Sequence, residues 1–242
     1  MKIHPIILPR RAFRNKKVCS KGSIAFQEHV LDSTGIVIGL SAIAYEIDWG
    51  DGLWDSDLMH TYEKAGIYQI RIYGVEINEL NISHCWVREI DVSECPWLEY
   101  LNVSYNALKK LDVSRCPYLS FLDCSVCMIQ ELILGDYLPW LIYLNCSRNL
   151  LKTLEFPREC NLYGVIAHHN ELVKLNMRVC ASIRCVDIAY NAMQFPDLRD
   201  TLESVPVVSG DEPAYIMYEM NPSSFEVDEQ KIKARGWRLQ AD

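Results

Sequence analysis

The sequence predicts a solenoid of the α/β class that is mostly β, and three observations predict it. Within residues 77–193, six segments fit the spacing L-x-x-L-x-L-x-x-N/C-x-L. The second apolar position of this pattern recurs at positions 80, 101, 122, 144, 165 and 186, in equal steps that one single-residue insertion near Gly135 interrupts. A further apolar pair follows the first five segments. Such a regular spacing indicates coils that each make one turn and stack on one another.

The six segments place Leu, Ile, Val, Cys, Ala, Met or Asn at five shared positions. They are Ile77/Leu80/Ile82/Cys85/Val87, Leu98/Leu101/Val103/Asn106/Leu108, Leu119/Leu122/Cys124/Cys127/Ile129, Leu141/Leu144/Cys146/Asn149/Leu151, Leu162/Val165/Ala167/Asn170/Leu172 and Ile183/Val186/Ile188/Asn191/Met193. Inward residues of neighbouring coils would stack at the strand spacing of ~4.8 Å. The pattern therefore predicts a leucine-rich-repeat right-handed superhelix of about six repeats, each 21–22 residues long, across residues 76–195.

Charge argues against nucleic acid as a partner. The chain has 242 residues and a formal net charge of −8, whereas nucleic-acid binding needs a basic footprint. Residues 1–22 are the local exception, because they carry seven Lys or Arg side chains and no acid. They predict a solvated basic arm, and a tail that seeks lipid or phosphate is the alternative.

Hydropathy predicts no membrane span and no export signal. A membrane helix needs about 18 consecutive apolar residues, and no run in the sequence approaches that length. The apolar patch near the N-terminus is too short for the core of a signal peptide and contains prolines. These features favour the cytoplasm as one of two expected locations.

Residues 23–75 predict a small antiparallel β unit. Residues 23–28, 35–41, 45–49 and 67–73 alternate or run apolar, as strands do. The sequence Gly50-Asp51-Gly52 supplies the positive φ angles that a tight hairpin needs. The segment leaves no room for a helix.

This unit resembles the β-sandwich of the polycystic-kidney-disease (PKD) type. The resemblance rests on Trp49-Gly50-Asp51-Gly52, His60-Thr61-Tyr62 and Gly66-Ile67-Tyr68-Gln69-Ile70, which match the pattern W-G-D-G…H-x-Y…G-x-Y-x-V. The unit is shorter than a full PKD domain. The resemblance therefore implies that some edge strands are missing and that the unit depends on packing against the first repeat.

The corners of the repeats carry a second resemblance. Ile90-Asp91-Val92-Ser93 and Leu111-Asp112-Val113-Ser114, each followed by Cys-Pro, are similar to the L-D-V-S repeats of leucine-rich surface proteins from Bacteroides-type bacteria. Those proteins often place a PKD-like unit ahead of the repeats, so the resemblance implies a cell-surface location. Repeats four to six lack the Asp-Val-Ser corner.

Two features should stabilise the coils. The side-chain amides of Asn106, Asn149, Asn170 and Asn191 can satisfy backbone groups where the chain turns out of each strand. The second apolar pairs alternate, so the back wall should be extended rather than helical. These pairs are Ile90/Val92, Leu111/Val113, Leu132/Leu134, Leu154/Phe156 and Leu175/Met177.

Beyond Asn191 the repeat pattern stops, and residues 196–242 predict a capping unit. Residues 197–204 begin with an Asp and have helical spacing, and Pro206 ends this helix. A strand is expected at 214–218, a short helix at 228–234 and a last strand at 237–239. A solenoid needs such an atypical unit to close its open end.

The ten cysteines are predicted to be free thiols rather than disulfides. Most fall in repeat columns, where a thiol behaves as a small buried hydrophobic group. The Cys124-x-x-Cys127 pair is interpreted as packing, because no second pair completes a zinc site. Cys19, Cys160 and Cys185 fall outside these columns. No metal or cofactor is predicted, and calcium at the acidic turn near Asp51 is a minor alternative.

The front of the predicted sheet is the candidate binding surface. Aromatic residues in three adjacent repeats, flanked by amides and acids, would face outward there, and such patches mark interfaces. The candidate residues are Tyr100, Asn102, Tyr105, Phe121, Asp123, Tyr143, Asn145, Arg148, His168, His169 and Tyr190. The polar columns have an alternative role, which is to stabilise the strands.

The predicted function is non-enzymatic recognition of another protein through this front face. A glycan ligand is one alternative, and a structural or display spacer at the cell surface is another. The sequence holds no G-x-S-x-G, P-loop, G-x-G-x-x-G or H-E-x-x-H motif, and hydrolysis at His168 and His169 is the weakest hypothesis.

Overall fold

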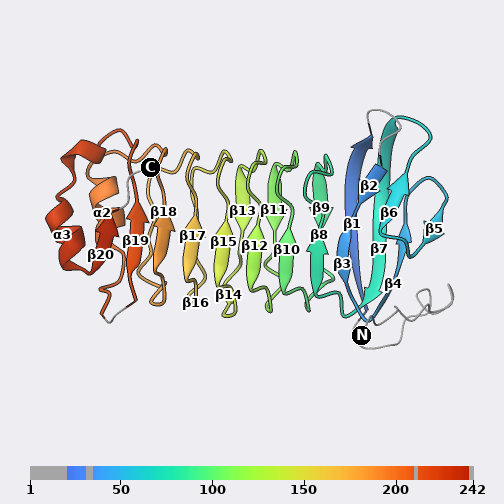
Figure 1. The fold of residues 1–242 in the computed structure, drawn as a ribbon, viewed down its shortest axis with the longest axis horizontal. Helices are drawn as coiled ribbons and strands as arrows, with labels where there is room; N and C mark the ends of the chain where they lie inside the picture. Colours follow the sequence, from blue (N-terminus) through green and yellow to red (C-terminus); the bar gives the residue numbers. More distant parts are fainter. Residues whose placement is uncertain (1–20, 31–34, 210–211, 240–242) are drawn as a thin grey trace.

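The computed structural model describes residues 21–30, 35–209 and 212–239, so all but two residues of the predicted basic arm lie outside the described ranges. The described chain is an elongated β solenoid, as the sequence predicts. An antiparallel β unit lies at one end, and the helices lie at the other (Figure 1).

One short strand from each turn forms the front sheet. The strands pair in parallel with side chains in register, so inward residues such as Leu80, Leu101 and Leu122 stack and are fully buried. We number the turns one to eight along the chain. Their strands are β8 (Glu79–Asn81), β10 (Tyr100–Asn102), β12 (Phe121–Asp123), β15 (Tyr143–Asn145), β17 (Gly164–Ile166), β18 (Cys185–Asp187), β19 (Ala214–Met217) and β20 (Trp237–Leu239).

The solenoid has about eight turns, two more than the leucine pattern identifies. The solenoid therefore continues past Asn191, where the leucine pattern of the sequence ends. Ile216 of β19 continues the buried register of Val186, and Asn221 accepts a hydrogen bond from the Met193 N–H as the earlier asparagines do. The step from Asn191 to Asn221 is longer than the regular repeat because it contains a helix, and this insertion hides the repeat in the sequence.

The asparagine ladder forms as predicted. Asn106 accepts hydrogen bonds at Oδ1 from the Cys85 and Val87 N–H groups of the preceding turn, and its Nδ2 donates to the Ile82 and Val103 carbonyls. Each amide thus satisfies backbone groups of two turns inside the bend. The same pattern recurs at Asn149, Asn170, Asn191 and Asn221.

The back wall is extended, as the apolar pairs predict. β11 (Lys110–Asp112) pairs in parallel with β13 (Glu131–Ile133), and β14 (Tyr137–Leu138) pairs with β16 (Glu159–Cys160). Toward the C-terminal end, the back wall of turn five pairs with helix α2 (Asp197–Glu203) instead of with another strand. The Leu175 N–H donates to Thr201 Oγ1 and the Met177 N–H donates to Ser204 Oγ, both at 3.0 Å.

The N-terminal unit is built on two long antiparallel strands. β1 (Lys21–Val30) and β7 (Gly66–Val75) pair antiparallel along their full length, and β4 (Ala44–Asp48) pairs with the other side of β7. β5 (Trp54–Asp55) extends this sheet. The predicted strand at 35–41 is two strands: β2 (Gly35–Val37) pairs with β6 (Met59–Thr61), and β3 (Gly39–Ser41) leaves the unit.

Two seams join this unit to the solenoid. β3 pairs antiparallel with β8 of the front sheet, and β1 pairs antiparallel with β9 (Glu89–Asp91) on the back wall. The unit therefore continues both walls of the first turn and covers its apolar end. The expected dependence of the unit on the first repeat stays a prediction.

The C-terminal end is closed by α2, the 3₁₀ turn η1 (Ser224–Glu226) and α3 (Glu229–Ala234). Asp228 caps α3 by accepting a hydrogen bond from the Gln230 N–H, as an N-cap residue does. Trp237 of β20 is buried, and its indole N–H donates to the Pro206 carbonyl at 2.8 Å. The helices and strands predicted in this region are confirmed, each within two residues.

Candidate functional site

Three aromatic rings of turns two to four stack along the front sheet. The Tyr100 and Phe121 ring centroids lie 4.6 Å apart at an interplanar angle of 7°, and those of Phe121 and Tyr143 lie 5.0 Å apart at 14°. Parallel strand register produces this stack, because each ring sits directly beside its counterpart one strand away. The rings are half-buried, and burial raises the pKa of the Tyr143 phenol.

A second row of aromatic residues lies at the corner that precedes these strands. In turns two to four, a β-turn closes with a backbone hydrogen bond at this corner, as from Leu98 N–H to the Cys95 carbonyl. Proline occupies the second turn position, which its fixed φ favours, and the third position holds an exposed aromatic side chain. These side chains are Trp97, Tyr118 and Trp140.

Ile142 and Tyr163 are exposed between this corner and the strands. The five residues Trp97, Tyr118, Trp140, Ile142 and Tyr163 form what we call the aromatic patch. It borders the ring stack of Tyr100, Phe121 and Tyr143, because only two residues separate the corner from the first strand position. Stack and patch together place eight apolar or aromatic side chains on turns two to five, beside Glu99 and Ser120.

The predicted polar residues of the front face lie beside this surface, but their oxygens serve the fold. Asn102 Oδ1 accepts hydrogen bonds from the Ser104 N–H and hydroxyl, and Asp123 and Asn145 do the same for the serines two residues on. Asn145 Nδ2 also donates to Asp123 Oδ2 at 3.3 Å. The alternative structural role of these columns is therefore present, and a role in binding stays a prediction.

A further predicted group follows each strand, where the backbone bends through positive φ. Tyr105, Arg148, His169 and Tyr190 have φ angles between 52° and 55°. The Tyr105 ring stacks on the neighbouring His84 at 4.1 Å, and Tyr190 stacks on His169 at 4.2 Å. These residues line the far edge of the front face and are separate from the aromatic patch.

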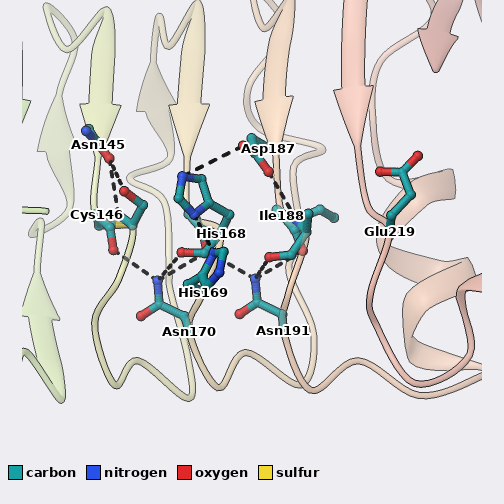
Figure 2. A network of polar contacts seen from close by, with 12 residues as sticks. Asn145, Cys146, His168, His169, Asn170, Asp187, Ile188, Asn191 and Glu219 are labelled. Atoms are coloured by element: carbon teal, nitrogen blue, oxygen red, sulfur yellow. Dashed lines mark hydrogen bonds and ion pairs between the residues drawn. The ribbon is translucent and has the colours of Figure 1, made fainter. Parts of the chain in front are cut away.

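His168 and His169 form a polar cluster in turns five and six. Their Nδ1 atoms lie 2.8 Å apart, and His168 Nε2 points toward Asp187 Oδ2 of the next turn at 4.0 Å (Figure 2). The amides of Asn170 and Asn191 lie beneath them and bind backbone carbonyls (Figure 2). Within the described part of the chain, no group of three or more His, Cys, Asp or Glu side chains is arranged to hold a metal ion.

The acidic turn of the N-terminal unit is likewise occupied by its own hydrogen bonds. Asp51 accepts from the Leu53 N–H and contacts His60 Nε2 at 2.8 Å, which holds the pKa of this carboxyl below its ordinary value although burial opposes it. Asp55 accepts from the Trp49 indole. His60 in turn stacks on Trp49 at 4.7 Å. These contacts stabilise the hairpin that β4 and β5 form.

The aromatic patch is the part of the surface that the strand columns alone do not reveal. Its signal occurs three times in the sequence, as Pro96-Trp97, Pro117-Tyr118 and Pro139-Trp140, each followed by an inward leucine. Aligning the corner residues as well as the strand residues would find it. The signal is specific, because a proline and an exposed aromatic residue recur at one offset.

Comparison with known proteins shows the fold. No protein-family model matches the sequence, and no curated protein matches it. Among solved structures, the chain is similar to the functional domain of InlJ from Listeria monocytogenes, which is described as including a cysteine ladder. That match has a TM-score of 0.53 and 24% identity, and it covers 65% of this chain and 33% of that one.

The fold is therefore that of a leucine-rich-repeat solenoid. The chain spans about a third of the length of the InlJ chain it matches. Over the residues that the structure describes, no helix is long and apolar enough to cross a membrane.

Proposed function

We propose that this protein is a non-enzymatic recognition module that binds another protein through the aromatic patch and the adjoining ring stack. The observation that carries the proposal is the row of exposed Trp and Tyr side chains repeated over three turns. Exposed aromatic surface on a rigid scaffold is characteristic of protein interfaces, where Trp and Tyr supply most of the binding energy.

The orientation of the rings favours a protein over a glycan. Sugars bind aromatic residues by lying on an open ring face. In the stack, Phe121 has one neighbouring ring against each face, and Trp97 and Tyr118 cover each other at 5.0 Å and 12°. Phe121 therefore offers its ring edge rather than a ring face to solvent, and ring edges pack against apolar side chains and carbonyl oxygens of a polypeptide.

The architecture supports a binding role rather than catalysis. The front sheet is a continuous surface of short strands in register, and the polar oxygens on it are committed to turns. A rigid, repetitive scaffold positions exposed side chains without lost entropy on binding. Display at the cell surface, which the resemblance to Bacteroides-type proteins implies, is consistent with this role and forms part of the proposal.

Site-specific photocrosslinking tests the proposal. A benzophenone amino acid would replace Trp140 in one variant and Trp86 in another, and each would be exposed to extracts and surface fractions of the native host. Trp86 is the matched control, because it is also a tryptophan, is 63% exposed against 59% for Trp140, and lies at the other end of the front strands.

The expected result is a discrete, protease-sensitive adduct at position 140 and none at position 86. An adduct that resists protease but is removed by glycosidases would point to the glycan alternative. Equal labelling at both positions, or no adduct at position 140 from any fraction, would contradict the proposal and favour the spacer.

A further inference from the structure

The corner column of the back wall contains four of the described cysteines. Parallel pairing of β14 with β16 places Cys160 in register with Leu138, in the column that also holds Cys95, Cys116 and Cys180. The expectation that Cys160 falls outside the repeat columns is therefore wrong. Cys180 follows Cys160 one residue sooner than the regular repeat would place it, and this shortened step hides the relationship in the sequence.

The two thiols at the end of this column are in contact. Cys160 Sγ and Cys180 Sγ lie 3.2 Å apart, on adjacent turns. Neighbouring strands are about 4.8 Å apart, which falls within the range of Cα separations, roughly 4.4–6.8 Å, that a disulfide bridges. The pair can therefore be joined by small side-chain rotations while the backbone keeps its place.

The two thiols differ in access and in acidity. Cys160 is 7% exposed, whereas Cys180 is fully buried. The hydrogen bond from the Cys180 thiol lowers the pKa of Cys160 below the ordinary value of a thiol, although burial opposes it. Burial instead raises the pKa of Cys95 and of Cys116, in the same column, to about 12. Only the thiolate is a nucleophile, so Cys160 is the reactive member.

We infer that Cys160 and Cys180 form a thiol-oxidation site at which small-molecule disulfides convert the pair into a disulfide between the fifth and sixth turns. This inference is independent of the proposed recognition function. The oxidant is a disulfide of the glutathione type, which accepts the two electrons that the pair gives up.

The chemistry takes two exchange steps. The Cys160 thiolate attacks one sulfur of the small disulfide, which forms a mixed disulfide and releases one small thiolate. The Cys180 thiol then passes its proton to that thiolate, and the Cys180 sulfur attacks Cys160 Sγ. This step forms the Cys160–Cys180 bond and expels the second small thiolate, which takes its proton from water.

The test is to incubate the full chain with oxidised glutathione, quench it with a thiol alkylating agent, and map its peptides by mass spectrometry. We expect a peptide pair linked through Cys160 and Cys180, with the loss of two hydrogen masses, before any other cysteine is modified. In C180S, the mixed disulfide should accumulate on Cys160 because the resolving thiol is gone, and in C160S both products should be lost.

The matched control is the pair Cys95 and Cys116, which occupies the same column on adjacent turns. The Cys95 thiol donates to the Ser23 carbonyl and the Cys116 thiol to the Val92 carbonyl, whereas Cys160, which donates to the Val179 carbonyl, is also in contact with the Cys180 sulfur. The control pair should stay reduced, and C116S should leave oxidation of Cys160 unchanged. The inference is overturned if the wild-type chain yields no Cys160–Cys180 link while other cysteines react, or if both pairs oxidise at the same rate. Because the wild-type peptide map alone separates these outcomes, the test does not depend on the variants folding.

Discussion

Asn149 Oδ1 accepts a hydrogen bond from the Ile129 N–H at 2.9 Å, across one turn of the solenoid. Its Nδ2 donates to the Cys124 carbonyl of the preceding turn and to the Cys146 carbonyl of its own turn. A single side chain thus ties two neighbouring coils together inside the bend, where water cannot replace it. Stability along the array depends on such contacts between neighbours.

Replacing Asn149 with Ala should lower the free energy of unfolding by about 3 kcal/mol, because buried backbone donors and acceptors lose their partners. Denaturant unfolding followed by circular dichroism measures the change. Asn161 is the control: it is exposed, and its Nδ2 bonds to the Pro139 carbonyl at the surface. N161A should cost under about 1 kcal/mol, and equal losses in both variants would refute the role of the ladder.

Val126 adopts φ of 52° at the bend after β12, a conformation that β-branched residues rarely take. Asparagine tolerates this region, so V126N should raise the free energy of unfolding by about 1 kcal/mol through relief of backbone strain. Val173, an exposed valine without positive φ, supplies the control, and V173N should bring no such gain. If V126N destabilises the protein, packing of the valine side chain outweighs the strain.

Glu28 is 5% exposed, and its Oε2 has no hydrogen-bond partner among the described residues. Burial raises the pKa of this carboxyl to about 7 from its ordinary value of 4.5. Between these two values the folded chain keeps a proton that the unfolded chain releases, so the free energy of unfolding should fall as the pH rises. The total change is of the order of 3 kcal/mol.

Denaturant unfolding at a series of pH values between about 5 and 7 checks this, with E28Q as the comparison. The variant should lack the fall in stability that the wild type shows across the window. Asp51 and Asp91 do not interfere there, because their pKa values are lowered below 3.8 and their contributions are lost only in stronger acid. A wild-type profile that is flat or rises with pH would contradict the prediction.

Once the partner is captured, W140A should weaken binding by about 30-fold, or about 2 kcal/mol, as expected for a tryptophan hot spot. Calorimetric titration measures the dissociation constant. W86A removes the same side chain at similar exposure from the other end of the strands and should change it less than about threefold. A larger effect of W86A would move the interface to that edge.

The sequence predicts this fold well wherever one turn differs from the next only by substitution. Six turns, their inward residues and the asparagine ladder follow from one regular spacing, because parallel register forces equal path lengths. Prediction from the sequence fails where the number of residues in one turn changes. A helix inserted before Asn221 hides the seventh turn, and a step one residue shorter than the repeat hides Cys160.

Only part of the candidate surface can be predicted from the sequence, because strand residues and corner residues follow different rules. Strand alternation identifies Tyr100, Phe121 and Tyr143, since successive strand residues face opposite sides. It carries no information about corners, where the direction of a side chain follows from turn geometry. The exposure of Trp97 and Trp140 therefore needed the structure, although the prolines before them mark the turns.

The antiparallel seam between β3 and β8 restricts how this protein can change its length. A parallel turn inserted ahead of β8 would have to displace β3, because β3 already occupies that edge of β8 through the Gly39–Asn81 and Ser41–Glu79 pairs. Duplications are therefore tolerated inside the array, in units of one whole coil, and not at its N-terminal end. Natural length variants should differ in the number of internal coils while keeping the same N-terminal junction.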